Sequence, residues 1–166
     1  MPLQYLAGQR LTADALQRAV PDRVRQNSDQ SVTSSITPVA SSIAITVDGL
    51  LKIDLELRFT PGGGGIRWDW LDAGSVTFIH RAVGAAGSAA TGNPSDVSSM
   101  HWRAMPDFAT DVSINQFNNF TTHRGTETLV VDGSGTLTLR FAQDASNAVA
   151  TTLSAESYAL ITRLGS

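Results

Sequence analysis

The stretch LLKIDLELRFT, residues 50–60, constrains the fold most, because its apolar and polar side chains alternate along its whole length. The odd positions from Leu51 to Phe59 are apolar, and the even positions from Lys52 to Thr60 are charged or hydroxylated. A period of two places the two sets on opposite faces of a β-strand, one in the core and one in water. Pro61 and four glycines follow, and they end the strand in a turn.

Similar strand patterns recur from Ser31 to the C-terminus, with Gly, Asn, Asp or Pro between them. Many short strands without intervening helical patterns are typical of an antiparallel sandwich, jelly roll or barrel. The stretch VVDGSGT at 130–136 predicts a hairpin, because two alternating runs flank residues suited to positive φ. The low-complexity segment 83–96 predicts a long exposed loop. Besides 50–60, the predicted strands are 66–71, 75–81, 100–105, 112–114, 120–123, 128–131, 136–142, 148–153 and 158–164.

Residues 1–30 differ from the rest and predict an N-terminal arm ahead of a β-domain at 31–166. Thr12 is a suitable N-cap and Pro21 ends the helical pattern, which predicts one helix of about two turns. The polar stretch 23–35 predicts a linker. A helix this short must dock on another surface to be stable, either on the rest of the domain or on a neighbouring protein.

The composition excludes several classes of function. A chain of 166 residues with a net charge of −3 and a single lysine lacks the cation clusters that bind nucleic acid. The absence of cysteine excludes disulfides, thiolate metal sites and cysteine nucleophiles. No apolar run approaches the roughly 20 residues of a membrane span, and the N-terminus lacks the pattern of a signal peptide. We therefore expect a protein made in a cytoplasm, with no nucleic-acid and no membrane partner.

Residues that could bind a metal or catalyse a reaction are present, but their spacing assigns them no such role. The three histidines lack a short metal-ligand spacing. Three acidic residues could supply the carboxylate pair of a glycosidase, but the sequence does not place two of them at the required separation. We predict no enzymatic activity, no metal site and no cofactor. The residues concerned are His80, His101, His123, Asp69, Asp72 and Glu127.

Trp68 and Trp70 fall on one face of a predicted strand and leave three interpretations open. Aromatic rows can stack on sugars, yet two tryptophans at a period of two are more common in cores and subunit interfaces. Trp102 has the same alternatives. A second feature is the polar gap at 143–148, which interrupts the strand pattern after Phe141. The gap could be an active site, a ligand loop or a turn.

The C-terminal third, GSGTLTLRFAQDASNAVATTLSAESYALITRLG at 133–165, resembles the last strands of small bacteriophage virion proteins with a C1q/TNF-like jelly roll. DGLLKIDLELRFT at 48–60 resembles the early long strand of such domains. AGQRLTADALQ at 7–17 resembles the opening of many head and tail proteins of actinobacterial phages. The C-terminal residues that carry the resemblance are Phe141, Ala142, Gln143, Ser146, Asn147, Thr151, Thr152 and Arg163–Gly165.

The resemblance implies an all-β, antiparallel jelly-roll sandwich that forms a homotrimer in the virion. It implies a capsid decoration or minor capsid protein bound to the major capsid protein or another virion protein. The alternative is a head-fibre or tail appendage that binds a host-surface glycan or receptor. The arm residues implied to anchor the protein are Leu3, Tyr5, Leu11, Leu16 and Val20. The subunit-interface candidates are Trp68, Trp70, Phe141, Gln143, Asn147 and Tyr158, and the glycan alternative would use Trp68, Trp70 and Trp102.

Overall fold

The computed structural model describes residues 20–86, 100–107, 110–114 and 123–164. In these ranges the chain forms one antiparallel sheet and no helix, which confirms the all-β prediction. The strands are β1 (Asp22–Arg25), β2 (Gln30–Val32), β3 (Val39–Asp48), β4 (Leu51–Thr60), β5 (Ile66–Ala86), β6 (Met100–Ala104), β7 (Val112–Ile114), β8 (His123–Ala142), β9 (Thr151–Leu153) and β10 (Tyr158–Arg163).

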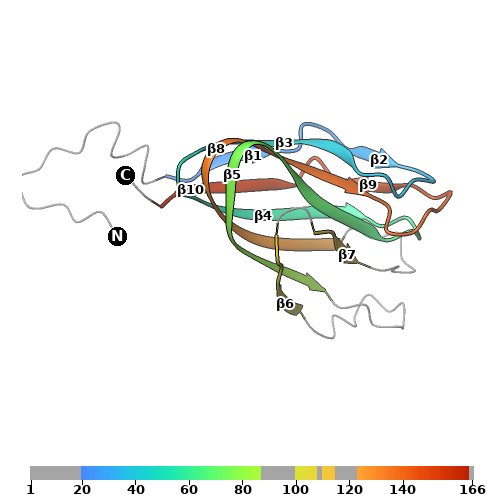
Figure 1. The fold of residues 1–166 in the computed structure, drawn as a ribbon. Coiled ribbons are helices and arrows are strands. Elements are labelled where there is room, and N and C mark those ends of the chain that lie inside the picture. Colours follow the sequence, from blue (N-terminus) through green and yellow to red (C-terminus); the bar gives the residue numbers. More distant parts are fainter. Residues whose placement is uncertain (1–19, 87–99, 108–109, 115–122, 165–166) are drawn as a thin grey trace, which may run out of the picture.

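Three long stretches of chain organise the sheet (Figure 1). The first stretch is β8, which lies at the centre. The second is β5, which pairs with one edge of β8. The third is formed by β3 and β4 together, which pair with the other edge of β8. All three stretches bend near the middle of β8, so the sheet folds over on itself into two layers. Layer I contains β3, β7 and the halves of β5 and β8 at 66–74 and 134–142. Layer II contains β1, β4, β6, β10 and the halves at 76–86 and 123–132.

Glycines make this bend possible. Gly74 and Gly133 have φ angles of 121° and 119°, a region that other residues rarely adopt. A Cβ at Gly133 would lie 2.1 Å from the carbonyl oxygen of Ser75, so the two backbones are in direct contact. The predicted hairpin at 130–136 is therefore wrong, because its glycines bend a continuous strand instead of reversing the chain. For the same reason, the strands predicted on either side of Gly74 are parts of one strand, β5.

A β-bulge in β5 changes which side chains face the core. The pairing with β8 shifts between Phe78 and His80, and the additional residue, Ile79, is 51% exposed. Before the bulge, even-numbered residues such as Trp68 face inward. After it, odd-numbered residues such as Arg81 face inward, because one inserted residue reverses the alternation.

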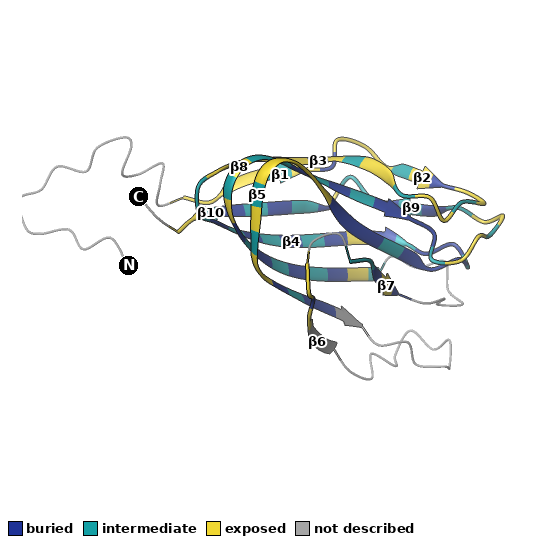
Figure 2. Cartoon of the chain, viewed as in Figure 1, coloured by how far each residue is buried: buried dark blue, intermediate teal, exposed yellow. Residues whose placement is uncertain are grey.

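The core lies between the two layers, and both contribute to a single apolar cluster (Figure 2). Layer I supplies Trp68, Trp70 and the apolar residues of β3, while layer II supplies the inner face of β4. The alternation predicted for 50–60 is confirmed, because every apolar residue of its odd face is at most 3% exposed. Those residues are Leu51, Ile53, Leu55, Leu57 and Phe59.

The chain joins the sheet earlier than predicted. β1 and β2 lie within the polar stretch 23–35, so its interpretation as a linker is wrong. Between them, the side chain of Gln26 accepts a hydrogen bond from Ser42 N at 2.8 Å and donates to Gln30 Oε1 at 3.1 Å. Gln26 is 2% exposed and connects the β1–β2 edge to β3 in layer I. The helix predicted between Thr12 and Pro21 falls almost entirely on residues outside the described part of the chain. Val20, the first described residue, is 63% exposed.

Candidate functional site

A carboxylate lies inside the core, between the two layers. It belongs to Glu127 on β8, whose side chain is fully buried. From layer I, Nε1 of Trp68 donates to Oε2 at 2.8 Å and Nε1 of Trp70 donates to Oε1 at 2.6 Å. From layer II, the fully buried Arg81 donates from Nε to Oε1 at 2.8 Å and from Nη2 to Oε2 at 3.2 Å. Glu127 therefore has the opposite charge and the donors that a buried carboxylate requires.

Arg81 also connects this cluster to the segment between β6 and β7. Its Nη1 donates to the carbonyl oxygens of Asp107 at 3.1 Å and Thr110 at 2.7 Å. The Asp107 side chain in turn accepts a hydrogen bond from Thr110 N at 2.6 Å. The cluster therefore joins both layers and one connecting segment. Because the Glu127 carboxylate is enclosed by protein donors, we interpret the cluster as structural and not catalytic.

The structure places the predicted aromatic residues inside the chain's own core. Trp68 and Trp70 share one face as predicted, but both are 0% exposed, and so is Phe141. Their side chains therefore have no surface available for a neighbouring subunit or a sugar, and the core interpretation replaces both of the others. The side chain of Trp102 lies outside the described part of the chain.

The acidic residues considered for catalysis are not brought together. Asp69 lies on the outer face of layer I, where it accepts a hydrogen bond from Nε of Arg140 at 2.9 Å. This hydrogen bond raises the pKa of Arg140 above its ordinary value. Glu127 points into the core, and Asp72 is exposed near the bend. These three carboxylates therefore cannot act as a pair across one substrate.

The histidines are also dispersed. His80 is exposed on β5, and the ring of His123 lies 6.0 Å from the ring of Phe59 between centroids. The side chain of His101 is not among those described. Within the described ranges, no three His, Cys, Asp or Glu residues are grouped so as to hold a metal ion. In the same ranges, no helix has the length and apolar character needed to cross a membrane.

The polar gap at 143–148 is a turn that is held by hydrogen bonds from the buried side chain of Gln143. Gln143 is 0% exposed, and its Oε1 accepts hydrogen bonds from Ser35 N at 3.2 Å and Asn147 N at 3.0 Å. Its Nε2 donates to the Val149 carbonyl at 2.8 Å. The side-chain amide is thus hydrogen-bonded within its own chain, so the predicted subunit contact through Gln143 is wrong. Asn147 remains partly exposed.

The four-glycine turn lies directly against this loop. A Cβ at Gly62 would be 1.9 Å from the Ala150 carbonyl oxygen, and one at Gly64 would be 2.4 Å from the Ala145 carbonyl oxygen. Thr151 adds a hydrogen bond from its hydroxyl to the Gly65 carbonyl at 2.8 Å. We call this end of the molecule, formed by residues 33–37, 61–65 and 143–150, the loop pole. Its glycines allow close backbone contact, so the turn is fixed in place and not a free hinge.

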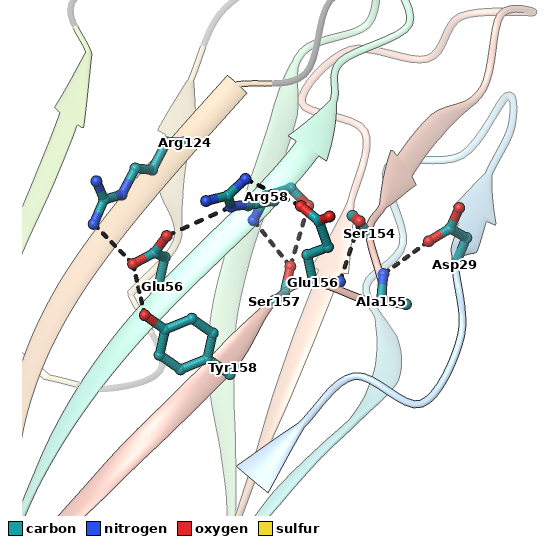
Figure 3. Close-up of polar contacts among 9 residues, drawn as sticks. All are labelled: Asp29, Glu56, Arg58, Arg124, Ser154, Ala155, Glu156, Ser157 and Tyr158. Atoms are coloured by element: carbon teal, nitrogen blue, oxygen red, sulfur yellow. Dashed lines mark hydrogen bonds and ion pairs between the residues drawn. The ribbon is translucent and has the colours of Figure 1, made fainter. Parts of the chain in front are cut away.

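A second cluster of polar side chains covers the outer face of layer II (Figure 3). Oε2 of Glu56 accepts hydrogen bonds from the Tyr158 hydroxyl at 2.9 Å and from Nη2 of Arg124 at 2.8 Å. Nε of Arg58 lies 3.5 Å from Oε1 of the same carboxylate, and its Nη1 pairs with Glu156 at 3.0 Å. The Glu56 side chain is only 13% exposed, whereas those of Arg58 and Arg124 are 46% and 61% exposed.

Tyr158 is the aromatic residue of this outer cluster. Its hydrogen bond to Glu56 is the main cause that raises the pKa of its hydroxyl above the ordinary value. The guanidinium of Arg23 lies over its ring, 4.6 Å from the centroid. Tyr158 thus remains at the surface, with one ring face covered and its hydroxyl pointing toward Glu56 (Figure 3).

Comparison with known proteins gives no assignment. No protein-family model matches the chain, and no curated protein is significantly similar to it.

Sequence reasoning did not single out Arg81 in the inner cluster or Glu56 and Arg124 in the outer one. Nothing local marks Arg81 as buried, because the bulge at Ile79 reverses the alternation that Trp68 and Trp70 establish. Glu56 was placed correctly on the polar face of its strand by the alternation. Its partner Tyr158 is 102 residues away in the sequence, so only the pairing of β10 with β4 brings them together.

Proposed function

We propose that this protein is a non-enzymatic structural protein of a bacteriophage virion, a homotrimeric capsid decoration protein with a jelly-roll domain. The resemblance of 133–165 and 48–60 to small virion proteins supports the domain type. The resemblance of 7–17 to phage head and tail proteins supports a role of the N-terminal segment in anchoring. The protein would assemble in the host cytoplasm and remain in the virion.

One observation carries this proposal: the described chain begins and ends at the same pole of the domain. Asp22 pairs with Ile161, so β1 starts where β10 ends. At the same end, Leu164 N donates to the Leu50 carbonyl at 2.9 Å, next to the bend of the sheet (Figure 1). We call this end the terminal pole; its exposed apolar residues include Val20, 63% exposed, and Leu164, 43% exposed.

Anchoring through the arm explains how such a protein stabilises a shell. An arm whose apolar residues are buried across neighbouring shell subunits binds the assembled shell and not its separated parts, so it shifts the equilibrium toward assembly. The terminal pole would face the shell and the loop pole would face away from it. The anchoring residues in this proposal remain Leu3, Tyr5, Leu11, Leu16 and Val20.

The subunit contact of the homotrimer must use residues other than the buried aromatic ones. Among the predicted candidates, only Asn147 and Tyr158 are partly exposed. The outer face of layer I offers an alternative, because Ala44, Thr138 and Leu71 form one row of it and Leu71 is 47% exposed. An exposed apolar side chain such as Leu71 would be buried if two such sheet faces packed together.

The experiment compares the full chain with a variant that lacks residues 1–19. Both are mixed with particles of the phage that encodes this protein, prepared without it. The amount of protein that sediments with the particles is then measured. We expect the truncated chain to keep its melting temperature and its trimeric mass in solution, but to lose binding. Truncation after residue 30 is unsuitable, because it would remove β1 and Gln26 from the sheet.

A matched pair of point variants separates anchoring from folding. Leu11→Asp with Leu16→Asp should abolish binding, whereas Gln9→Asp with Gln17→Asp adds the same charge at neighbouring positions and should leave binding intact. Complete decoration of particles by the truncated chain would rule out the arm. The number of copies of the protein per particle then shows where on the virion it is bound. Hundreds of copies indicate the shell, and a dozen or fewer indicate a tail or vertex appendage.

The alternative function is a fibre appendage that binds a glycan through Trp68, Trp70 and Trp102. Two of these three tryptophans have no side-chain surface that a glycan could contact. Trp68 and Trp70 are enclosed in the core and hydrogen-bonded to Glu127. No observation on the described residues favours that version.

A further inference from the structure

The outer face of layer II contains a shallow hollow of about 440 Å³ over β4, β8 and β10. Two rows of side chains that cross these strands line it. Tyr158, Glu56 and Thr126 form one row, and Leu160, Asp54 and Thr128 form the next. The volume is within the range of small-molecule sites in proteins, about 300–1,000 Å³.

The hollow results from the sizes of the side chains in these rows. Thr126 and Thr128 on β8 are short, while Tyr158 on β10 and Arg124 at the end of β8 are long. Each threonine is paired with a carboxylate residue of β4 in the register: Thr126 with Glu56 and Thr128 with Asp54. The floor of the hollow therefore combines hydroxyls and carboxylates with a larger share of apolar surface, and its rim is made of longer side chains.

The charges of the hollow are compensated within it. Asp54 pairs with Lys52 at 2.7 Å, and Glu56 pairs with Arg124 at 2.8 Å. A phosphate or other anion would meet the carboxylates of Asp54 and Glu56, and a cation would meet Arg124 at the rim and Lys52, which lies outside the lining but pairs with Asp54. A neutral ligand is the one that neither set of charges repels.

The hydroxyls of the hollow present free acceptor capacity. The Tyr158 hydroxyl donates to Glu56, and the Thr128 hydroxyl donates to Asp54 at 2.8 Å. Each hydroxyl oxygen has two acceptor lone pairs, and each carboxylate oxygen can accept more than one hydrogen bond. A ligand that donates through several hydroxyls at once therefore fits the floor. Leu160 and the ring of Tyr158 add apolar surface for its C–H groups.

From these observations we propose that this hollow, which we call the β4–β8–β10 hollow, binds a neutral saccharide. The ligand's hydroxyls donate to the oxygens of Tyr158, Thr126 and Thr128, and the rim arginine Arg124 donates to its ring or hydroxyl oxygens. The site contains no tryptophan and differs from every sugar site that the sequence suggests. It also lies on the face of the domain and not at the terminal pole, so it does not depend on anchoring through the arm.

The test uses the full chain and three neutral hexasaccharides: cellohexaose, fully N-acetylated chitohexaose and maltohexaose. Binding is measured by calorimetry, and the location is measured from amide chemical shifts in NMR spectra. Hexagalacturonate and inorganic phosphate serve as charged comparisons. We expect at least one neutral hexasaccharide to bind, with the largest shifts at Thr126, Thr128 and Leu160, and neither charged compound to bind there.

Two double variants at threonines provide the matched control. Thr126→Val with Thr128→Val removes two hydroxyl acceptors from the hollow while keeping the side-chain shape. Thr60→Val with Thr152→Val makes the same change at a facing, half-buried pair outside the hollow and outside the proposed subunit contact. We expect the first variant to weaken binding about tenfold and the second to leave it unchanged.

Three results would overturn the proposal. The first is that none of the neutral hexasaccharides binds at millimolar concentration, or that only the charged compounds bind. The second is that binding is equally weakened by both double variants. The third is that Thr126→Val with Thr128→Val changes the oligomeric mass of the protein, which would make this face a subunit contact. The arm-deletion experiment is unaffected by each of these results, so the two proposals fail separately.

Discussion

Layer II carries two glutamates with similar partners on its opposite faces. Glu127 points inward and accepts hydrogen bonds from two tryptophans and Arg81, all fully buried. Glu56 points outward and accepts hydrogen bonds from Tyr158 and Arg124, which water can reach. The two residues are near neighbours, since Glu127 pairs with Leu55 on the adjacent strand.

The difference between the two clusters is the availability of water as a replacement partner. If one member of the inner cluster is removed, the remaining charge stays in a dry core and cannot be solvated. If one member of the outer cluster is removed, the others turn toward solvent. The same kinds of side chain therefore fix the fold on one face and leave exchangeable hydrogen bonds on the other, where a ligand can take part.

The largest expected effect separates the two glutamates directly. Glu127→Ala should reduce the free energy of unfolding by about 3–5 kcal/mol, because Arg81 is left buried without its counter-charge. Glu56→Ala should cost about 1 kcal/mol or less, because both of its arginines remain solvated. Chemical denaturation of both variants measures the difference. Equal losses would show that burial does not distinguish the clusters.

A smaller effect appears in the coupling between the partners. A double-mutant cycle of Arg81→Met and Glu127→Gln should give an interaction energy of about 2–3 kcal/mol that changes little with salt. The cycle of Arg124→Met and Glu56→Gln should give about 0.5 kcal/mol, and added salt should reduce it further. A strong salt dependence of the inner coupling would mean that water reaches Glu127.

The smallest effect is a titration at the outer cluster. The hydrogen bond to Glu56 raises the pKa of Tyr158 in the folded state. Its contribution to stability is therefore complete below the ordinary tyrosine pKa of about 10 and is lost as the pH rises through the folded-state value. The chain has two tyrosines, so Tyr5→Phe leaves Tyr158 alone for measurement by tyrosinate absorbance. Adding Glu56→Gln should lower the midpoint, and an unchanged midpoint would contradict the assigned cause.

Local alternation predicted much of the fold. It identified the all-β class and the inward face of β4, because a strand with one buried face must alternate. It failed where glycines have two possible roles, since Gly133 suits a hairpin turn and also a bend in a continuous strand. It also failed at 23–35, where polar residues form two short strands that are held in place partly by Gln26.

The candidate sites were less predictable than the fold. The sequence placed Trp68 and Trp70 together but could not choose between core, interface and sugar platform, because all three use aromatic residues on one strand face. The partners that decide for the core, Glu127 and Arg81, come from later parts of the chain. The polar gap after Phe141 was noticed, yet the role of Gln143 depends on Ser35, which lies 108 residues earlier.

The sequence by itself determined the period of the strands, the buried face of β4, and the turn that Pro61 and the following glycines form after it. These follow from nearest-neighbour stereochemistry and the side chain's preference for water or core. Only the tertiary structure decided that three long stretches bend together, that the bulge at Ile79 turns Arg81 inward, and that Glu127 and Glu56 acquire similar partners on opposite faces. Those outcomes depend on pairing between strands far apart in the chain, and no local pattern encodes which strand becomes the neighbour.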